Sequence, residues 1–92
     1  MTQSAQRTTT HRGHFDVTFH GSDFSPAIGI NRNSRVWASA TELHNGVEPI
    51  SGGAHVTVQQ VVPSDNGTVI VRIWVDNVPV DILVQVTLFC LD

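Results

Sequence analysis

A long alternation of apolar and polar residues between His55 and Phe89 constrains the fold of this chain more than any other feature. Successive side chains of a β-strand point to opposite faces of a sheet, so such an alternation gives each strand one apolar face. Turn-forming residues interrupt it at Ser64-Asp65-Asn66-Gly67 and at Asp76-Asn77. We therefore expect three strands joined by two tight turns, a C-terminal three-strand meander.

The two turns predict which residues face each other. A two-residue turn at Asp76-Asn77 would bring apolar residues together on the inner face: Val75 with Val78, Ile73 with Val80, Val71 with Ile82 and Val69 with Val84. On the other face, the same turn would pair Trp74 with Pro79, Arg72 with Asp81 and Ile70 with Leu83. A four-residue loop at 64–67 would pair Val62 with Val69, Val58 with Ile73 and Val56 with Val75. Both turns predict the same inner face, and a slip of one residue would exchange the faces. One polar residue, Gln60, lands on the apolar face and would need a hydrogen-bond partner there.

Shorter elements are expected before the meander. Alternation predicts a strand over residues 14–20, and a short apolar piece, 27–30, is expected as a second strand or an extended segment. Residues 35–43 alternate as a strand, although the run Ala-Thr-Glu-Leu-His at 40–44 would also fit a helical turn. With no convincing helix, the chain is predicted to be all-β: a six-stranded antiparallel β-sandwich forming a single domain over residues 13–92.

Residues 1–12 contain mainly Thr, Gln and Ser, with little apolar surface to offset the entropy lost on ordering. We expect this segment to be a flexible N-terminal arm. His11 and His14, near its end, suggest a metal or anion site, but two histidines lack the third protein ligand that a zinc site needs. A solvated tail is the alternative, and we predict no metal.

Composition excludes several partners. The 92 residues carry a formal net charge of −3 and no Lys, so we expect binding neither to nucleic acid nor to an anionic membrane. No apolar run is long enough to span a bilayer, and no signal-peptide pattern is visible. The expected location is therefore cytoplasmic or reached by a non-classical export route. Cys90 is the single cysteine, so no intrachain disulfide can form.

The second face of the predicted meander is too apolar for a lone two-layer domain. Its apolar residues are Val61, Ile70, Trp74, Leu83, Phe89 and Leu91. Such a patch is typical of a subunit interface. We therefore expect a homo-oligomer, a trimer or a dimer, with the trimer favoured and the Ile70, Leu83 and Phe89 end in contact with another subunit.

The same register gathers a candidate ligand site around Trp74. Its members are one indole, one guanidinium, one carboxylate, one amide and one hydroxyl: Trp74, Arg72, Asp81, Gln59 and Thr57. A sugar ring offers an apolar C–H face and a rim of hydroxyls, which suits a flat aromatic surface beside planar hydrogen-bonding groups. Alternatively, Arg72 and Asp81 form a structural cross-strand pair and Trp74 packs in a subunit contact.

Other candidates are weaker. Arg32, Asn33, Arg35 and Trp37 surround a polar turn that could bind an anion or a sugar, or could simply be solvated. Glu42 and His44 place an acid near a base, but no nucleophile accompanies them. Cys90 ends an apolar strand, where thiols are usually inert, and no glycine-rich loop opens a helix. We predict no enzymatic activity and no cofactor.

The pattern of strands and turns resembles the H-type lectins. The resemblance rests on Val17-Thr18-Phe19, Phe24-Ser25-Pro26, Val61-Val62-Pro63 with Gly67, Ile73-Trp74 and the final alternating strand. It implies a six-stranded antiparallel sandwich, assembly as trimers, and N-acetylgalactosamine or galactose-type sugars bound at subunit boundaries. Trp74 matches the family's tryptophan, but Val75, Val80 and Thr57 stand where the family has histidine, tyrosine and arginine. The resemblance therefore supports the fold and the oligomer better than that ligand.

Two functions follow as hypotheses from these observations. The first is an oligomeric, non-enzymatic carbohydrate-binding module of lectin-like form. The second is a structural assembly protein, such as a virion decoration or tail component, whose outer face and N-terminal arm contact neighbouring subunits.

Overall fold

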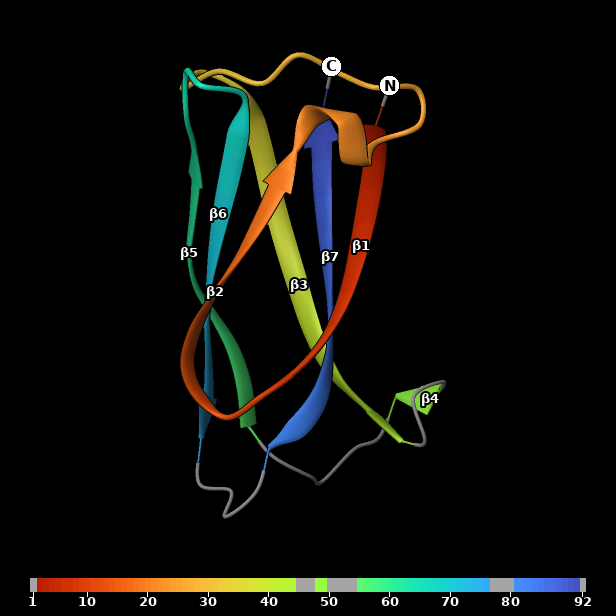
Figure 1. The fold of residues 1–92 in the computed structure, drawn as a ribbon, viewed down its shortest axis with the longest axis vertical. Helices are drawn as coiled ribbons and strands as arrows, with labels where there is room; N and C mark the ends of the chain where they lie inside the picture. The colour runs from red at the N-terminus through yellow and green to blue at the C-terminus, as the bar shows by residue number, and fades with distance from the viewer. Residues whose placement is uncertain (1, 45–47, 50–54, 77–80, 92) are drawn as a thin grey trace.

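The computed structural model describes residues 2–44, 48–49, 55–76 and 81–91, which form two antiparallel sheets (Figure 1). One sheet has the order β1-β7-β3-β4, and its strands are β1 (Thr2–His11), β7 (Ile82–Leu91), β3 (Arg35–His44) and β4 (Glu48–Pro49). The other has the order β2-β6-β5, with β2 (Gly13–His20), β6 (Thr68–Asp76) and β5 (His55–Pro63). The predictions of an all-β fold and of a strand beginning at Arg35 are confirmed.

A single hydrophobic core receives side chains from both sheets. The most buried members from β6 and β2 are Val69, Val71, Ile73 and Phe19, and those from β7 are Val84, Val86 and Leu88. These are alternate residues of each strand, as the apolar periodicity requires. The inward row of β7 continues to Cys90, so that alternate residues point to the core over residues 82–90.

The predicted meander is wrong in its second hairpin. β6 lies between β2 and β5, whereas β7 lies between β1 and β3 in the other sheet. Val71 therefore faces Val17 instead of Ile82, and Arg72 faces Asp16 instead of Asp81. The turn itself, including Val78 and Val80, falls outside the described residues. Alternation fixes which side chains of a strand point inward but does not identify the neighbouring strand. The inner faces of both sheets need an apolar row, so the row of β7 fits either sheet.

The first hairpin of the meander is confirmed with one change of register. Val58 faces Ile73 and Val56 faces Val75, as predicted. A β-bulge between Val58 and Gln60 then shifts the pairing, so Val62 faces Ile70 rather than Val69. Because a bulge inserts one extra residue, it reverses the inward and outward positions beyond it. Gln60 is consequently exposed, and the predicted buried amide does not occur.

The N-terminal segment is a strand, and the expectation of a flexible arm is wrong. Thr2–His11 pairs with β7 along its whole length, from Thr2 opposite Leu91 to His11 opposite Ile82. An edge strand is held by backbone hydrogen bonds, which do not require an apolar side chain at every second position. Ala5 is buried in the core, and β-branched threonines suit a half-exposed strand.

Residues 21–34 connect the two sheets without a further strand. A short 3₁₀ helix, η1 (Gly21–Asp23), is followed by an irregular segment in which Phe24 and Ile30 are buried in the core. Residues 27–30 thus form no strand, which was one of the two predicted alternatives. Within the described part of the chain, no helix has the length and hydrophobicity needed to cross a membrane.

The apolar residues expected to form one interface patch are divided between the two sheets. Ile70 and Trp74 lie on β6, whereas Leu83 and Phe89 lie on β7 in the opposite sheet. Val61 packs against the core. The prediction of one continuous patch is therefore wrong, because it depended on direct pairing of β6 with β7.

Candidate functional site

The outer face of the β2-β6-β5 sheet carries rings and planar polar groups at neighbouring positions. The register places His14 opposite Trp74 and Asp16 opposite Arg72. From β5, Thr57 lies opposite Trp74 on the other side. We call this set, together with Gln59, the Trp74 surface; its members are His14, Asp16, Thr57, Gln59, Arg72 and Trp74.

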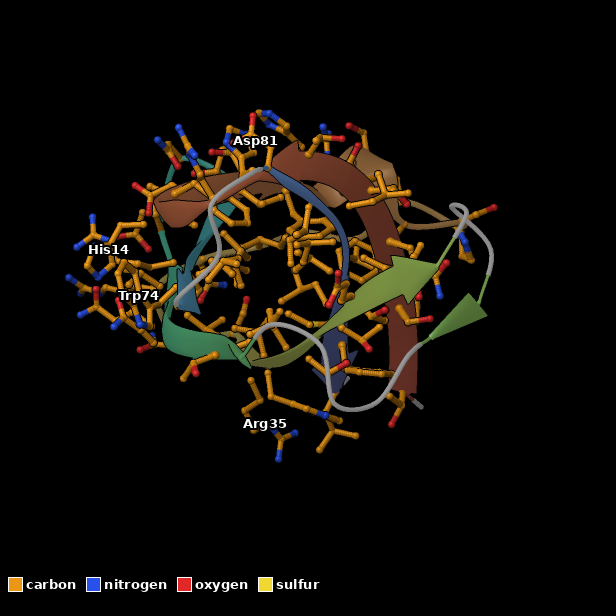
Figure 2. All side chains as sticks on the ribbon, turned by 90° about the horizontal axis from the view of Figure 1, so that it is seen from below. His14, Arg35, Trp74 and Asp81 are labelled. Atoms are coloured by element: carbon orange, nitrogen blue, oxygen red, sulfur yellow. The ribbon has the colours of Figure 1, made fainter. Side chains whose placement is uncertain are left out.

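The aromatic part of the Trp74 surface is a pair of rings. The His14 imidazole and the Trp74 indole have centroids 4.1 Å apart and an interplanar angle of 31°. Figure 2 shows both side chains next to each other on the outside of the molecule. Gly13 begins β2 with φ of +71°, a conformation that glycine adopts readily, and a Cβ atom there would lie 4.0 Å from Cζ3 of Trp74. The chain thus enters β2 close to one edge of the indole.

The charged part is a fork of two hydrogen bonds. Arg72 donates from Nε to Oδ1 of Asp16 over 3.0 Å and from Nη2 to Oδ2 over 3.4 Å. This hydrogen bonding lowers the pKa of Asp16 below its ordinary value and raises the pKa of Arg72. Both side chains are about half exposed, at 51% for Arg72 and 44% for Asp16, so solvent screens the pair and its role in holding the fold is small.

A depression of about 340 Å³ opens beside these groups. It is lined by His14, Phe15, Asp16, Gln59 and Arg72. Gln59 reaches this position from the bulge in β5, where the extra residue interrupts the ladder. Bulges commonly redirect a side chain near a functional surface.

Four of the five predicted site residues come together and one does not. Trp74, Arg72, Thr57 and Gln59 belong to the same outer face. Asp81 lies next to the start of β7 in the other sheet, where its Oδ1 is 3.5 Å from Nε of Arg12. Figure 2 shows it well separated from the Trp74 indole. Its inclusion depended on the pairing of β6 with β7, which does not occur.

His14 and Asp16 are the residues that sequence reasoning missed. Their place on the polar side of the first alternating segment was visible in the sequence, but the pairing of that segment with β6 was not. The sequence instead associates His14 with His11 as a candidate metal or anion site. The structure places His11 against Phe15, with centroids 4.5 Å apart, so the two histidines contact different rings. Among the described residues, no group of three or more metal-ligating side chains is found.

The second candidate cluster is divided by its own contacts. Arg32 turns to Asp65 of the β5-β6 hairpin, with its backbone N–H donating to Oδ1 over 3.0 Å. Asn33 donates its backbone N–H to Oδ1 of Asn31 over 2.8 Å, which stabilises the turn itself. Trp37 stacks on Phe89 with centroids 5.5 Å apart. The turn is thus held by a hydrogen bond within it and by one to Asp65, and Arg32 and Trp37 contact different partners.

Comparisons with protein-family models, with curated proteins and with solved structures found no match to this chain. The Trp74 surface itself is therefore the feature of the molecule that indicates a function. Chemically, that surface combines an aromatic platform with hydrogen-bond donors and acceptors and with charges that cancel between Asp16 and Arg72.

Proposed function

We propose that the protein is a non-enzymatic carbohydrate-binding module whose ligand lies on the Trp74 surface. The observation that carries the proposal is the position of the Trp74 indole next to the Asp16–Arg72 fork and the depression beside it. Sugar rings bind through an apolar C–H face and a rim of hydroxyls, and aromatic rings and planar polar groups are complementary to these two parts.

The size and charge of the surface favour a small neutral sugar. The depression of about 340 Å³ is at the lower end of the range of about 300–1,000 Å³ for small-molecule sites. Asp16 and Arg72 cancel each other's charge, so an acidic sugar or a phosphate gains no net attraction. A guanidinium has five N–H donors, of which two are directed to Asp16, and the carboxylate oxygens accept more than one hydrogen bond each.

The Trp74→Ala variant tests this proposal against the other tryptophan of the chain. A glycan array that contains neutral and acidic glycans identifies the ligand, and calorimetry with that glycan in solution then measures the affinity per site. We expect Trp74→Ala to weaken binding by at least about tenfold, or 1.4 kcal/mol. Trp37→Ala, on the opposite sheet, is the matched control and should bind like the wild type. An array without any signal, or loss of binding in Trp37→Ala alone, would contradict the proposal.

A structural assembly protein is the second candidate, and the outer face of the β1-β7-β3 strands favours it. Trp37 is 45% exposed there, next to Phe89 and near Leu91. Threonine, serine and glutamine side chains occupy much of the remaining face. We propose, for either function, that the chain forms a homo-oligomer, and the resemblance to H-type lectins favours a trimer. Sedimentation as a monomer at micromolar concentration would contradict this part of the proposal.

A further inference from the structure

The outer edge of β1 is the feature from which we draw a new inference. β1 lies at the end of its sheet, with β7 on its other side, and forms a rim of the molecule in Figure 1. A strand at the edge of a sheet presents backbone N–H and C=O groups that can pair with another strand. At ten residues, β1 is long for such an edge.

β5, an edge strand of the other sheet, has features that discourage strand addition. β5 contains the bulge between Val58 and Gln60 and ends at Pro63, and bulges and prolines both interrupt pairing. β1 has neither. Its outward row is exposed and consists of uncharged residues: Thr2, Ser4, Gln6, Thr8 and Thr10.

Space is also present beside this edge. A depression of about 420 Å³ lies between Arg7, Thr8 and Thr9 of β1 and residues 16–18 and 20 of β2. The Arg7 side chain crosses toward η1, where its Nη2 is 3.0 Å from Oδ2 of Asp23. The middle of β1 is therefore bordered by an opening rather than by a packed neighbour.

We propose that two copies of this chain associate through antiparallel pairing of their β1 edges. A two-fold contact brings the same surface of both copies together. Each residue of β1 must therefore suit the residue that it faces on the antiparallel β1 of the partner subunit. With the axis at Gln6, Thr2 faces Thr10 of the partner subunit and Ser4 faces Thr8 of the partner subunit. Gln6 faces its own counterpart. Cross-strand pairs of hydroxyl side chains are favourable.

Charge selects this register over its neighbours. Centring the pair on Gln6 places Arg7 opposite Ala5 of the partner subunit, and it aligns residues 2–10 of both strands. A shift of the axis to Arg7 would place two guanidinium groups directly opposite each other, which is destabilising. A shift to Ala5 would shorten the paired region to residues 2–8. The register centred on Gln6 thus pairs more residues than the one centred on Ala5, and unlike the one centred on Arg7 it has no like-charge contact.

Disulfide trapping tests the contact in the full chain. In the proposed register the two Cα atoms at position 6 are about 4.5–5.5 Å apart, which is within the range that a disulfide can bridge. The two copies of position 8 are displaced by four residues, or about 13 Å. We expect Gln6→Cys to form a disulfide-linked dimer roughly tenfold faster than Thr8→Cys, because pairing raises the effective concentration of facing thiols. The double variant Ser4→Cys/Thr8→Cys should cross-link as Gln6→Cys does, and Cys90, which is buried, remains in every variant.

The results of cross-linking and sedimentation test the β1 contact separately from the homo-oligomer and from the glycan site. The inference rests on the proposed homo-oligomer but not on the glycan site. It takes the dimer rather than the trimer, because a two-fold contact uses the same surface of both copies and joins only two of them. Equal cross-linking of Gln6→Cys and Thr8→Cys would overturn the register. A wild-type oligomer in sedimentation without cross-linking of Gln6→Cys would overturn the β1 contact and leave the oligomer standing, whereas a wild-type monomer would overturn both.

Discussion

At the residue scale, the Trp74 surface depends on partners contributed by β2. The His14 ring lies against the Trp74 indole, and Asp16 accepts hydrogen bonds from the Arg72 guanidinium on the neighbouring strand. The inward and outward positions of all four residues follow from alternation in the sequence. Their contacts could not be predicted, because alternation does not identify the strand next to β6.

Gly21 illustrates a constraint on a single residue that lies outside the site. Its backbone oxygen accepts a hydrogen bond from the N–H of Ile28 over 3.1 Å, and a Cβ atom at Gly21 would collide with the carbonyl oxygen of Ile28. We expect Gly21→Ala to lower the free energy of unfolding by about 1–3 kcal/mol, the usual cost of forcing atoms into a packed position. Gly29→Ala is the control, since no atom lies within 4 Å of its Cβ position. Urea unfolding that shows equal stability for both variants would contradict this account.

Asp23 gives a pH dependence whose direction follows from its contacts. Its pKa is lowered by the hydrogen bond from the His20 backbone N–H, 2.7 Å from Oδ2, and further by Arg7. A carboxyl group with a lowered folded-state pKa stabilises the fold above its unfolded-state pKa and loses this effect as the pH falls through the folded-state pKa. The stabilisation should therefore be present at neutral pH and vanish in acid, below a pH of about 4.

The Asp23→Ala variant measures this contribution. We expect it to lower the free energy of unfolding by about 1 kcal/mol at pH 7, the usual net contribution of a hydrogen bond. At pH 2 the variant and the wild type should differ much less, because the wild-type carboxyl group is then protonated. An equal difference at both pH values would show that the charge of Asp23 has no part in the effect.

At the element scale, the sequence predicts strands better than it predicts their neighbours. The alternating rows of β2, β3, β6 and β7 are correct, and so is the loop at 64–67, where the N–H of Gly67 donates to the Ser64 oxygen over 3.1 Å. The placement of β6 and β7 in different sheets is determined by long-range packing, which no local pattern encodes. β1 was not predicted, because its pairing with β7 depends on backbone hydrogen bonds rather than on apolar side chains.

Ala5 tests whether β1 is part of the fold. It is 7% exposed, whereas its neighbour Ser4 is exposed on the other side of the strand. A carboxylate buried without a partner destabilises a protein strongly, while an exposed substitution typically changes stability by less than about 0.5 kcal/mol. Ala5→Asp should therefore unfold at much lower urea concentration than Ser4→Asp. A flexible arm would tolerate both changes equally.

The bulge in β5 can be tested by deletion. Gln59 is the additional residue between Val58, which faces Ile73, and Gln60, which faces Arg72. Its removal keeps Val58 and Val61 on the inner face, so we expect a folded protein that is less stable by about 1 kcal/mol. In a bulge-free register Gln60 and Val62 would face inward, and the same deletion would turn both outward and bring Val61 inward. Loss of the cooperative unfolding transition would contradict the expected tolerance of the deletion.

At the scale of the whole molecule, the two sheets separate two kinds of surface. The β2-β6-β5 sheet presents the Trp74 surface, and the β1-β7-β3 strands present Trp37, Phe89 and the β1 edge. An assembly through the β1 edge would leave the Trp74 surface of each copy accessible. Several copies would then bind a multivalent glycan more tightly than one copy does.

The two tryptophans of the chain allow one measurement to test the central claim directly. Each indole N–H gives its own resonance in a ¹H–¹⁵N spectrum, and Trp74 and Trp37 lie on different sheets. During titration with the glycan selected by the array, the account predicts that the Trp74 indole resonance shifts together with the backbone amides of His14, Asp16 and Gln59, while the Trp37 indole resonance stays in place. A shift of the Trp37 resonance with an unchanged Trp74 resonance would contradict it.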